Sequence, residues 1–141
     1  MHRLAAVLEE AAEIQKAGIV TDIEKDTVSN TKFRKVIFTG EYLQLVLMSL
    51  GDSEEIGEEV HEDTDQFFRV DAGDGKLVMG NVSYNIADGT AFVIPAGVKH
   101  NVIAGRKGLK VYTLYGPPRH PAGTVLDKKE GAWSLMSDPA N

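Results

Sequence analysis

Short runs of strand-forming residues, separated by turn residues, dominate the sequence from Ile19 onward. About nine such runs, rich in β-branched and aromatic side chains, fall within roughly 85 residues, and no helical pattern lies between them. Glycine-containing turns punctuate the runs, for example at Gly40, at 73–75, at 88–89 and at Gly105. The expected strands cover residues 32–38, 42–50, 58–61, 66–70, 76–79, 82–86, 90–94, 100–103 and 109–115. This spacing predicts an all-β sandwich or barrel.

The N-terminal segment shows a helical pattern instead. Apolar side chains recur there at three- and four-residue steps, and Gly18 is placed to end the helix. We therefore expect an amphipathic N-terminal helix within residues 1–18, whose stripe packs on the barrel of its own chain or on a partner subunit. The stripe consists of Leu4, Val7, Leu8, Ala11, Ala12 and Ile14.

The predicted strand around residues 43–48 is apolar on both faces. Its sequence, Leu-Gln-Leu-Val-Leu-Met, is typical of a strand covered on one side by a barrel interior and on the other by a helix or a second subunit. Together with the N-terminal stripe, this pattern predicts a homodimer.

The chain of 141 residues is long enough for one domain with its own core. We expect the barrel to occupy residues 19–116. Residues 117–141 are expected to form an extended tail, because Pro117, Pro118 and Pro121 account for three of the five prolines.

Composition excludes several classes of function. The sequence contains no cysteine, so disulfides, thiol nucleophiles and cysteine-bound metals are excluded. The net charge of −6 and the scattered basic residues argue against a nucleic-acid partner. No apolar run approaches the length of about 20 residues that a membrane-spanning helix needs, and the N-terminus lacks a signal-peptide pattern. We therefore expect a cytoplasmic protein without a membrane or nucleic-acid partner.

One histidine stands in a distinctive frame of turn residues. Gly89 is followed after five residues by Pro95, then by Gly97, and two residues later by His100. The glycine turns the chain into a strand, and Pro95 with Gly97 forms a tight turn. His100 then begins the returning strand, where alternation can point it inward.

A second segment places polar residues at strand spacing. Glu59 and His61 are separated by one residue, so in an extended strand they face the same side, roughly 6.5 Å apart. The polar stretch 62–65 can turn the chain, and Gln66 then begins the next strand.

Together these two segments resemble the paired motifs of the cupin superfamily, which are Gly-x5-His-x-His-x3–4-Glu-x6-Gly and Gly-x5-Pro-x-Gly-x2-His. Glu59 stands at the first histidine position of that frame, and Gln66 stands at the glutamate position. The similarity extends from about residue 32 to 116. It implies a jelly-roll barrel, or double-stranded β-helix. It also implies a metal site made by Glu59, His61, Gln66 and His100.

Two imidazoles, one carboxylate and one amide oxygen suit one divalent transition metal, namely Fe, Mn, Ni, Zn or Co. Two assignments in this set have alternatives. Gln66 can instead hydrogen-bond within the barrel or hold a water molecule. Asp63 competes with Glu59, because it also lies two residues from His61. His120 is expected to be a tail residue without a role in the site.

The resemblance leaves two functional hypotheses. The tail after Tyr115 is similar to that of small single-domain cupins often labelled mannose-6-phosphate isomerase-like, but cupins include dioxygenases, isomerases, lyases and binding modules. The first hypothesis is a metal-dependent enzyme of one of these reaction types that acts on a small polar molecule, with Glu59 as a candidate general base. The alternative is a non-catalytic cupin that binds or senses a small molecule, and Gln66 in place of a glutamate motivates it.

Overall fold

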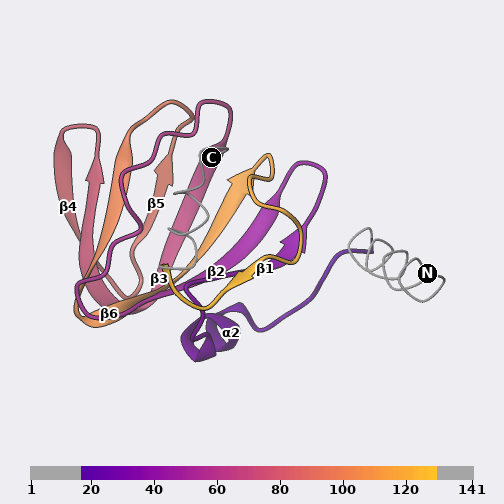
Figure 1. Ribbon diagram of the computed structural model, residues 1–141, viewed down its shortest axis with the longest axis horizontal. Helices are drawn as coiled ribbons and strands as arrows, with labels where there is room; N and C mark the ends of the chain where they lie inside the picture. Colours follow the sequence, from indigo (N-terminus) through magenta and orange to yellow (C-terminus); the bar gives the residue numbers. More distant parts are fainter. Residues whose placement is uncertain (1–16, 130–141) are drawn as a thin grey trace.

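The computed structural model describes residues 17–129, and the N-terminal helix predicted within 1–18 therefore falls almost wholly outside the described residues (Figure 1). One helix and seven strands follow one another along this part of the chain. In order they are α2 (Ile23–Ser29), β1 (Arg34–Thr39), β2 (Gln44–Leu50), β3 (Asp65–Met79), β4 (Val82–Ala87), β5 (Ala91–Ile94), β6 (His100–Gly116) and β7 (Val125–Leu126).

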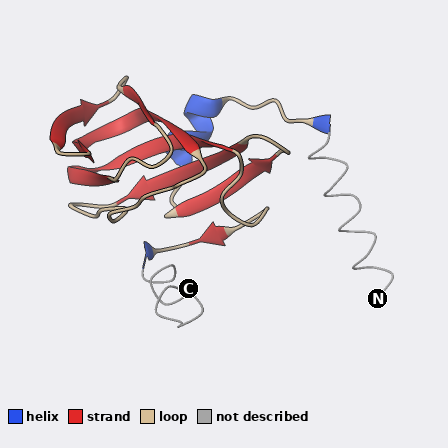
Figure 2. Cartoon of the chain, turned by 90° about the horizontal axis from the view of Figure 1, so that it is seen from above, coloured by secondary structure: helices blue, strands red, loops and turns tan. Residues whose placement is uncertain are grey.

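The seven strands form one antiparallel sheet in the order β4-β3-β6-β2-β1-β7, and β5 also pairs with β3. β5 lies along residues 66–69 of β3, whereas β4 lies along residues 74–79. The sheet is strongly curved and folds over an apolar core (Figures 1 and 2). The all-β prediction is confirmed.

The turn predicted at residues 73–75 is wrong. The runs 66–70 and 76–79 are parts of the single strand β3, which is 15 residues long, and the runs 100–103 and 109–115 are parts of β6, which is 17 residues long. The register between these strands shifts twice, between Val70 and Ala72 and between Gly73 and Gly75. Glycines here mark β-bulges, which bend a strand without reversing it.

The glycines at this bend are required by close backbone contact. A Cβ atom on Gly73 would overlap the carbonyl oxygen of Gly108, and one on Gly75 would overlap that of Ile103. Gly73 also has a φ of +84°, which disfavours every other residue. The bulges therefore let β3 and β6 approach each other where the sheet bends.

Inward-facing residues of β2, β3 and β6 lie opposite one another across the sheet, and each such row is here called a rung. One rung is polar: Gln44 of β2 and Gln66 of β3 both lie opposite Tyr115 of β6. All three side chains are at most 2% exposed. The neighbouring rungs are largely apolar and belong to the core, whose central-strand members are Val46, Met48, Leu50, Phe68, Val70, Leu77, Val102, Ala104, Leu109, Val111 and Tyr115.

Helix α2 was not expected, since the segment from Ile19 onward was interpreted as β-rich. Asp22 caps it by accepting a hydrogen bond from the backbone N–H of Lys25, 3.2 Å away. The helix contacts β2, β3 and β6, and Leu47, on the outer face of β2, is only 2% exposed. A helix of the same chain therefore covers the second apolar face of β2, and the homodimer stays a prediction.

The tail is partly built into the sheet. Val125 and Leu126 of β7 pair with Lys35 and Arg34 of β1, which the sequence did not predict. None of the helices within residues 17–129 is long and apolar enough to span a membrane.

Replacing Gly73 by alanine should destabilise the fold by about 2 kcal/mol or more, because the new methyl group meets backbone and the residue keeps a positive φ. Gly80→Ala is the matched control, since Gly80 also has a positive φ, of +61°, but nothing lies within 4 Å of a Cβ there. The control should cost about 1 kcal/mol. Urea unfolding measures both changes, and equal losses would contradict the close-contact explanation.

Candidate metal centre

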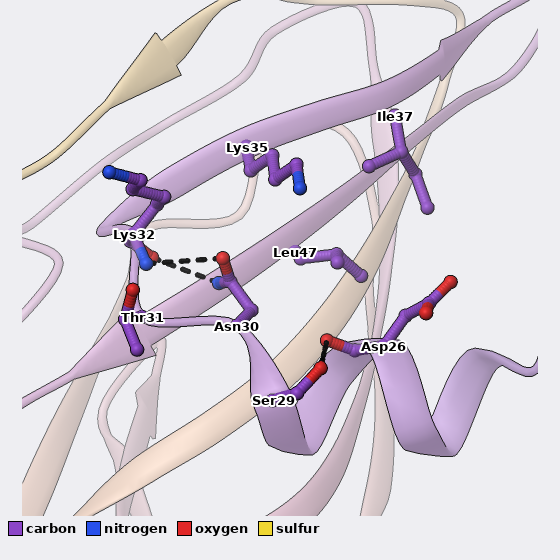
Figure 3. A pocket seen from close by; sticks show the side chains of 8 residues that line it. All are labelled: Asp26, Ser29, Asn30, Thr31, Lys32, Lys35, Ile37 and Leu47. Carbon is purple, nitrogen blue, oxygen red and sulfur yellow. Dashed lines mark hydrogen bonds between the residues drawn. The ribbon is translucent and has the colours of Figure 1, made fainter.

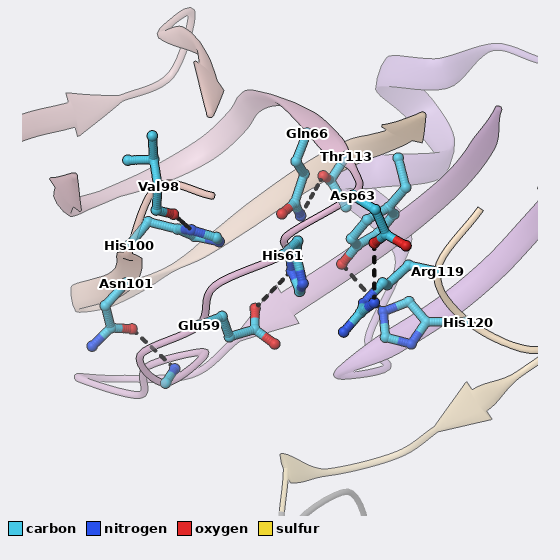
Figure 4. Close-up of polar contacts among 12 residues, drawn as sticks. Glu59, His61, Asp63, Gln66, Val98, His100, Asn101, Thr113, Arg119 and His120 are labelled. Atoms are coloured by element: carbon cyan, nitrogen blue, oxygen red, sulfur yellow. Dashed lines mark hydrogen bonds and ion pairs between the residues drawn. The ribbon is translucent and has the colours of Figure 1, made fainter. Parts of the chain in front are cut away.

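Three of the four predicted ligands converge in the structure. Ligand atoms of Glu59, His61 and His100 all lie within 4.8 Å of one another. Figure 4 shows the two imidazoles and the carboxylate facing a common point, with Gln66 beside them. Both histidines are buried, with exposed fractions of 6% and 3%.

Backbone pairing brings these residues together. Glu59 and His100 form an isolated antiparallel bridge, in which each N–H donates to the other residue's carbonyl oxygen at 2.8 and 2.9 Å. The carbonyl oxygen of His61 accepts a hydrogen bond from the N–H of Gly97 at 2.8 Å. The strand expected at 58–61 is thus reduced to one bridge, which still aligns the segment with the start of β6.

The hydrogen bonding of His100 leaves a nitrogen free for a ligand. Its Nδ1 lies 2.9 Å from the carbonyl oxygen of Val98. A carbonyl only accepts, so Nδ1 carries the proton and Nε2 carries the lone pair. Nε2 is buried and lacks a hydrogen-bond partner. Metal-binding histidines show this arrangement, with one nitrogen bonded to a backbone carbonyl.

His61 is held without a hydrogen bond to either ring nitrogen. Both nitrogens are buried and unpartnered, and Nε2 lies 3.6 Å from Oε1 of Glu59, which is longer than a hydrogen bond. Its ring is also near two others, with centroids 5.4 Å from that of His100 and 5.9 Å from that of Tyr115. Buried polar atoms without partners are costly, and a metal ion would satisfy Nε2 of His100 and one of the two ring nitrogens of His61.

Glu59 lies on the solvent side of the site, with 29% of its side chain exposed. Burial raises the pKa of its carboxyl group, but the contact with His61 and the nearby charge of Arg34 outweigh burial and lower the pKa overall. The carboxyl group is therefore ionised at neutral pH, which is the form that binds a metal ion.

The side-chain amide of Gln66 has a hydrogen-bond partner for its nitrogen but not for its oxygen. The hydroxyl of Thr113 donates its only proton to the carbonyl oxygen of Phe67 at 2.8 Å, so it can only accept from Gln66. Nε2 of Gln66 donates this bond at 2.9 Å. Oε1, the atom that could bind a metal, is left buried and unpartnered.

Comparison with known proteins agrees with this geometry. The family model for the cupin domain matches residues 46–115. YrkC of Bacillus subtilis (strain 168), an uncharacterised protein, is 44% identical over 120 residues, which are 80% of this chain and 64% of YrkC. The crystal structure of BH2720 from Bacillus halodurans is 41% identical, has a TM-score of 0.81 and aligns over 83% of this chain and 94% of that protein.

An RmlC-like cupin from Shewanella frigidimarina shares the fold at 20% identity, with a TM-score of 0.58 over 62% of this chain and 77% of its own. The chain belongs to the cupin family. The resemblance stated for the two motifs is confirmed, and so is the jelly-roll barrel. The match covers 64% of the length of YrkC, so any activity of that whole protein does not transfer.

Asp63, the alternative to Glu59, is not part of the cupin's metal cluster. Its side chain is 82% exposed, and its carboxylate lies 3.7 Å from the guanidinium of Arg119. The chain turns after His61, as the polar stretch 62–65 predicts, and this turn carries Asp63 out to the rim.

The sequence did not reveal that the tail of this cupin reaches its site. Gln44 binds the tail with both ends of its amide: Oε1 accepts from the N–H groups of Arg119 and His120 at 3.0 and 2.9 Å, and Nε2 donates to the carbonyl oxygen of His120 at 2.7 Å. Nε2 of His120 then lies 3.2 Å from the hydroxyl of Tyr115. His120 is a tail residue, as expected, but its ring lies against that of Tyr115, and the expectation that it has no role in the site stays a prediction.

Burial keeps both members of this pair neutral. Desolvation raises the pKa of the Tyr115 phenol well above its usual range, so the phenol is protonated. Desolvation, together with the charge of Arg34, lowers the pKa of His120 to about 4. The phenol accordingly donates its proton to the imidazole nitrogen.

Two surface pockets of this cupin lie outside the candidate metal centre. One, of about 240 Å³, lies between α2 and the strands β1 and β2 (Figure 3). The other, of about 480 Å³, lies along β4 and the first part of β6. Neither shares a residue with the cluster of Glu59, His61 and His100.

The depressed pKa of His120 predicts a dependence of stability on pH. Between pH about 6.5 and about 4 the unfolded chain binds a proton at this residue and the folded chain does not, so the free energy of unfolding should fall with falling pH. In metal-free protein, His120→Asn should lose less stability across this window than the wild type. Urea unfolding at several pH values measures this, and parallel profiles for the two proteins would contradict it.

Proposed function

We propose that this cupin binds one divalent transition metal and is a metal-dependent enzyme that acts on a small polar molecule. The observation that carries the proposal is the pair of buried imidazoles with unpartnered nitrogens facing an ionised carboxylate. This donor set fits Fe, Mn, Ni, Zn or Co better than Ca²⁺ or Cu⁺.

The residues of the site have distinct proposed roles. His61 and His100 supply neutral nitrogen ligands, Glu59 supplies the carboxylate, and Oε1 of Gln66 is the candidate fourth ligand. When bound, the metal would act as a Lewis acid that polarises a carbonyl or hydroxyl group, or as a centre for oxygen chemistry. The buried rung of Gln44, Gln66 and Tyr115 would exclude water from the inner side of the bound metal.

Two groups are available for proton transfer. Glu59 is partly exposed and can exchange between ligand and general base, although its lowered pKa makes it a weak base. The Tyr115 phenol lies against His61 and keeps its proton, so it can donate a hydrogen bond to a bound oxygen if it gives up the bond to His120. Both would act on a substrate that enters from the side of Glu59.

His61→Ala and His100→Ala should each abolish stoichiometric binding of Co²⁺, because each removes one of two nitrogen ligands. Elemental analysis of purified, Co²⁺-loaded protein gives the measurement. Asp63→Asn is the matched control, since it removes a carboxylate close in sequence but outside the cluster, and it should retain full metal content. A histidine variant with undiminished metal content would refute the site.

The orientation of Gln66 yields a separate prediction. Thr113→Val removes the acceptor that holds the amide nitrogen, so Oε1 loses its alignment and metal affinity should fall by about 10- to 100-fold. Gln66→Glu should strengthen metal binding, because a carboxylate replaces a neutral oxygen. Competition with a chelator measures both affinities, and an unchanged affinity in both variants would show that Gln66 is not a ligand.

The non-catalytic alternative rests on the same residue. An amide is a weaker ligand than the family's usual carboxylate, as expected for a cupin that binds or senses a small molecule without turning it over. Turnover of any compound by the metal-loaded protein, lost in His100→Ala, would exclude this alternative.

A further inference from the structure

In the part of the chain that the structure describes, one buried cation lies inside the fold without an ion-pair partner. Arg34 on β1 is only 8% exposed. It shares its face of the strand with Val36, which belongs to the core, whereas Lys35 between them is exposed. The guanidinium is thus directed to the inner side of the sheet.

The guanidinium has few compensating contacts. Its Nε is buried and lacks a hydrogen-bond partner. Among residues 17–129, no carboxylate forms an ion pair with it. Its central carbon lies 5.3 Å from the centre of the Phe33 ring, a contact that offsets only part of the cost of burying a charge. A buried charge without a partner is rare in folded proteins unless a ligand supplies the partner.

The positive charge of Arg34 affects the pKa values of residues at the candidate metal centre. It lowers the pKa of Glu59 more strongly than His100 does, although His100 is paired to Glu59 through the backbone. It also lowers the pKa of Tyr115 and of His120. Glu59 belongs to the cluster, Tyr115 lies against His61, and His120 lies against Tyr115, so the charge of Arg34 acts on the same region as the candidate ligands.

Glu59 does not neutralise Arg34. Its carboxylate oxygen lies against His61, and it forms no ion pair with Arg34. If Glu59 binds the metal, its charge is shared with the metal ion as well. The positive charge of Arg34 therefore remains available to a bound molecule.

We propose that the molecule bound at this site carries an anionic group, most simply a carboxylate, that pairs with Arg34. The proposal rests on the proposed function and narrows it from a small polar molecule to a small organic acid. A guanidinium offers two parallel N–H donors to a carboxylate, and such charge-assisted pairs are the stronger kind of hydrogen bond. The acid would extend from the metal toward Arg34.

The test compares small carboxylates with their neutral amides. Calorimetry measures the dissociation constants of acetate, glycolate and pyruvate, and of acetamide, glycolamide and pyruvamide, with Co²⁺-loaded wild-type protein. At least one acid should bind about tenfold more tightly than its amide. Arg34→Met should abolish that preference, Arg34→Lys should retain part of it, and the control Lys35→Met, which removes an exposed cation from the same strand, should match the wild type.

Stability provides a second readout. Without ligand, Arg34→Met should unfold at a temperature no lower than the wild type, because methionine replaces an unpaired buried charge. A large loss of stability would show that the fold itself already compensates the charge, and would overturn the proposal.

Metal content separates this proposal from the proposed function. Repeating the titrations after treatment with a chelator, and measuring Co²⁺ in every variant, shows which of the two fails. Absence of Co²⁺ from the wild type refutes the metal centre, even where an Arg34-dependent preference for acids persists. A preference that is absent in the wild type, or undiminished in Co²⁺-loaded Arg34→Met, refutes the role of Arg34.

Discussion

The bend in the paired strands β3 and β6 is the constraint on which the site depends. His100 and Tyr115 lie near opposite ends of β6, and an unbent strand would separate them by about 50 Å. Yet the rings of both lie within 6 Å of the ring of His61, centroid to centroid. Only a strand that turns back at its middle can do this, and the bulges at Gly73 and Gly75 let its partner follow the bend. The candidate metal centre is therefore a product of the sheet's curvature.

Charge in this curved interior is distributed unevenly. The two histidines and the amide of Gln66 are buried, while the carboxylate of Glu59 lies at the solvent side. Tyr115 and His120 are also held neutral by burial. Arg34 is the exception, because it is charged, its Nε lacks a hydrogen-bond partner, and no carboxylate within residues 17–129 forms an ion pair with it. A site of this kind stores unfavourable interactions that a metal ion and an anion could relieve together.

Short-range patterns predicted much of this arrangement. The alternation of strand residues placed Glu59 and His61 on one side, and the Gly-Pro-Gly frame placed His100 at the start of a strand. Long-range effects were missed. The sequence pattern of glycines at 73 and 75 is compatible with either a turn or a β-bulge. Only the pairing of this segment with β6 shows that it is a bulge. Helix α2 is seven residues long and too short for a clear apolar stripe. Arg34 is flanked by an aromatic and a charged residue, so its burial could not be inferred from its neighbours.

The amide of Gln44 has a consequence for how this family can diversify. It binds the tail through backbone atoms of Arg119 and His120 and makes no demand on their side chains. This attachment of the tail to the barrel does not depend on the tail's side chains, whereas the contact of His120 with Tyr115 does. Substitutions in the tail could change the surroundings of the site while the candidate metal ligands and the curved sheet stay unchanged. The barrel would keep the chemistry constant, and a loosely constrained segment would tune selectivity.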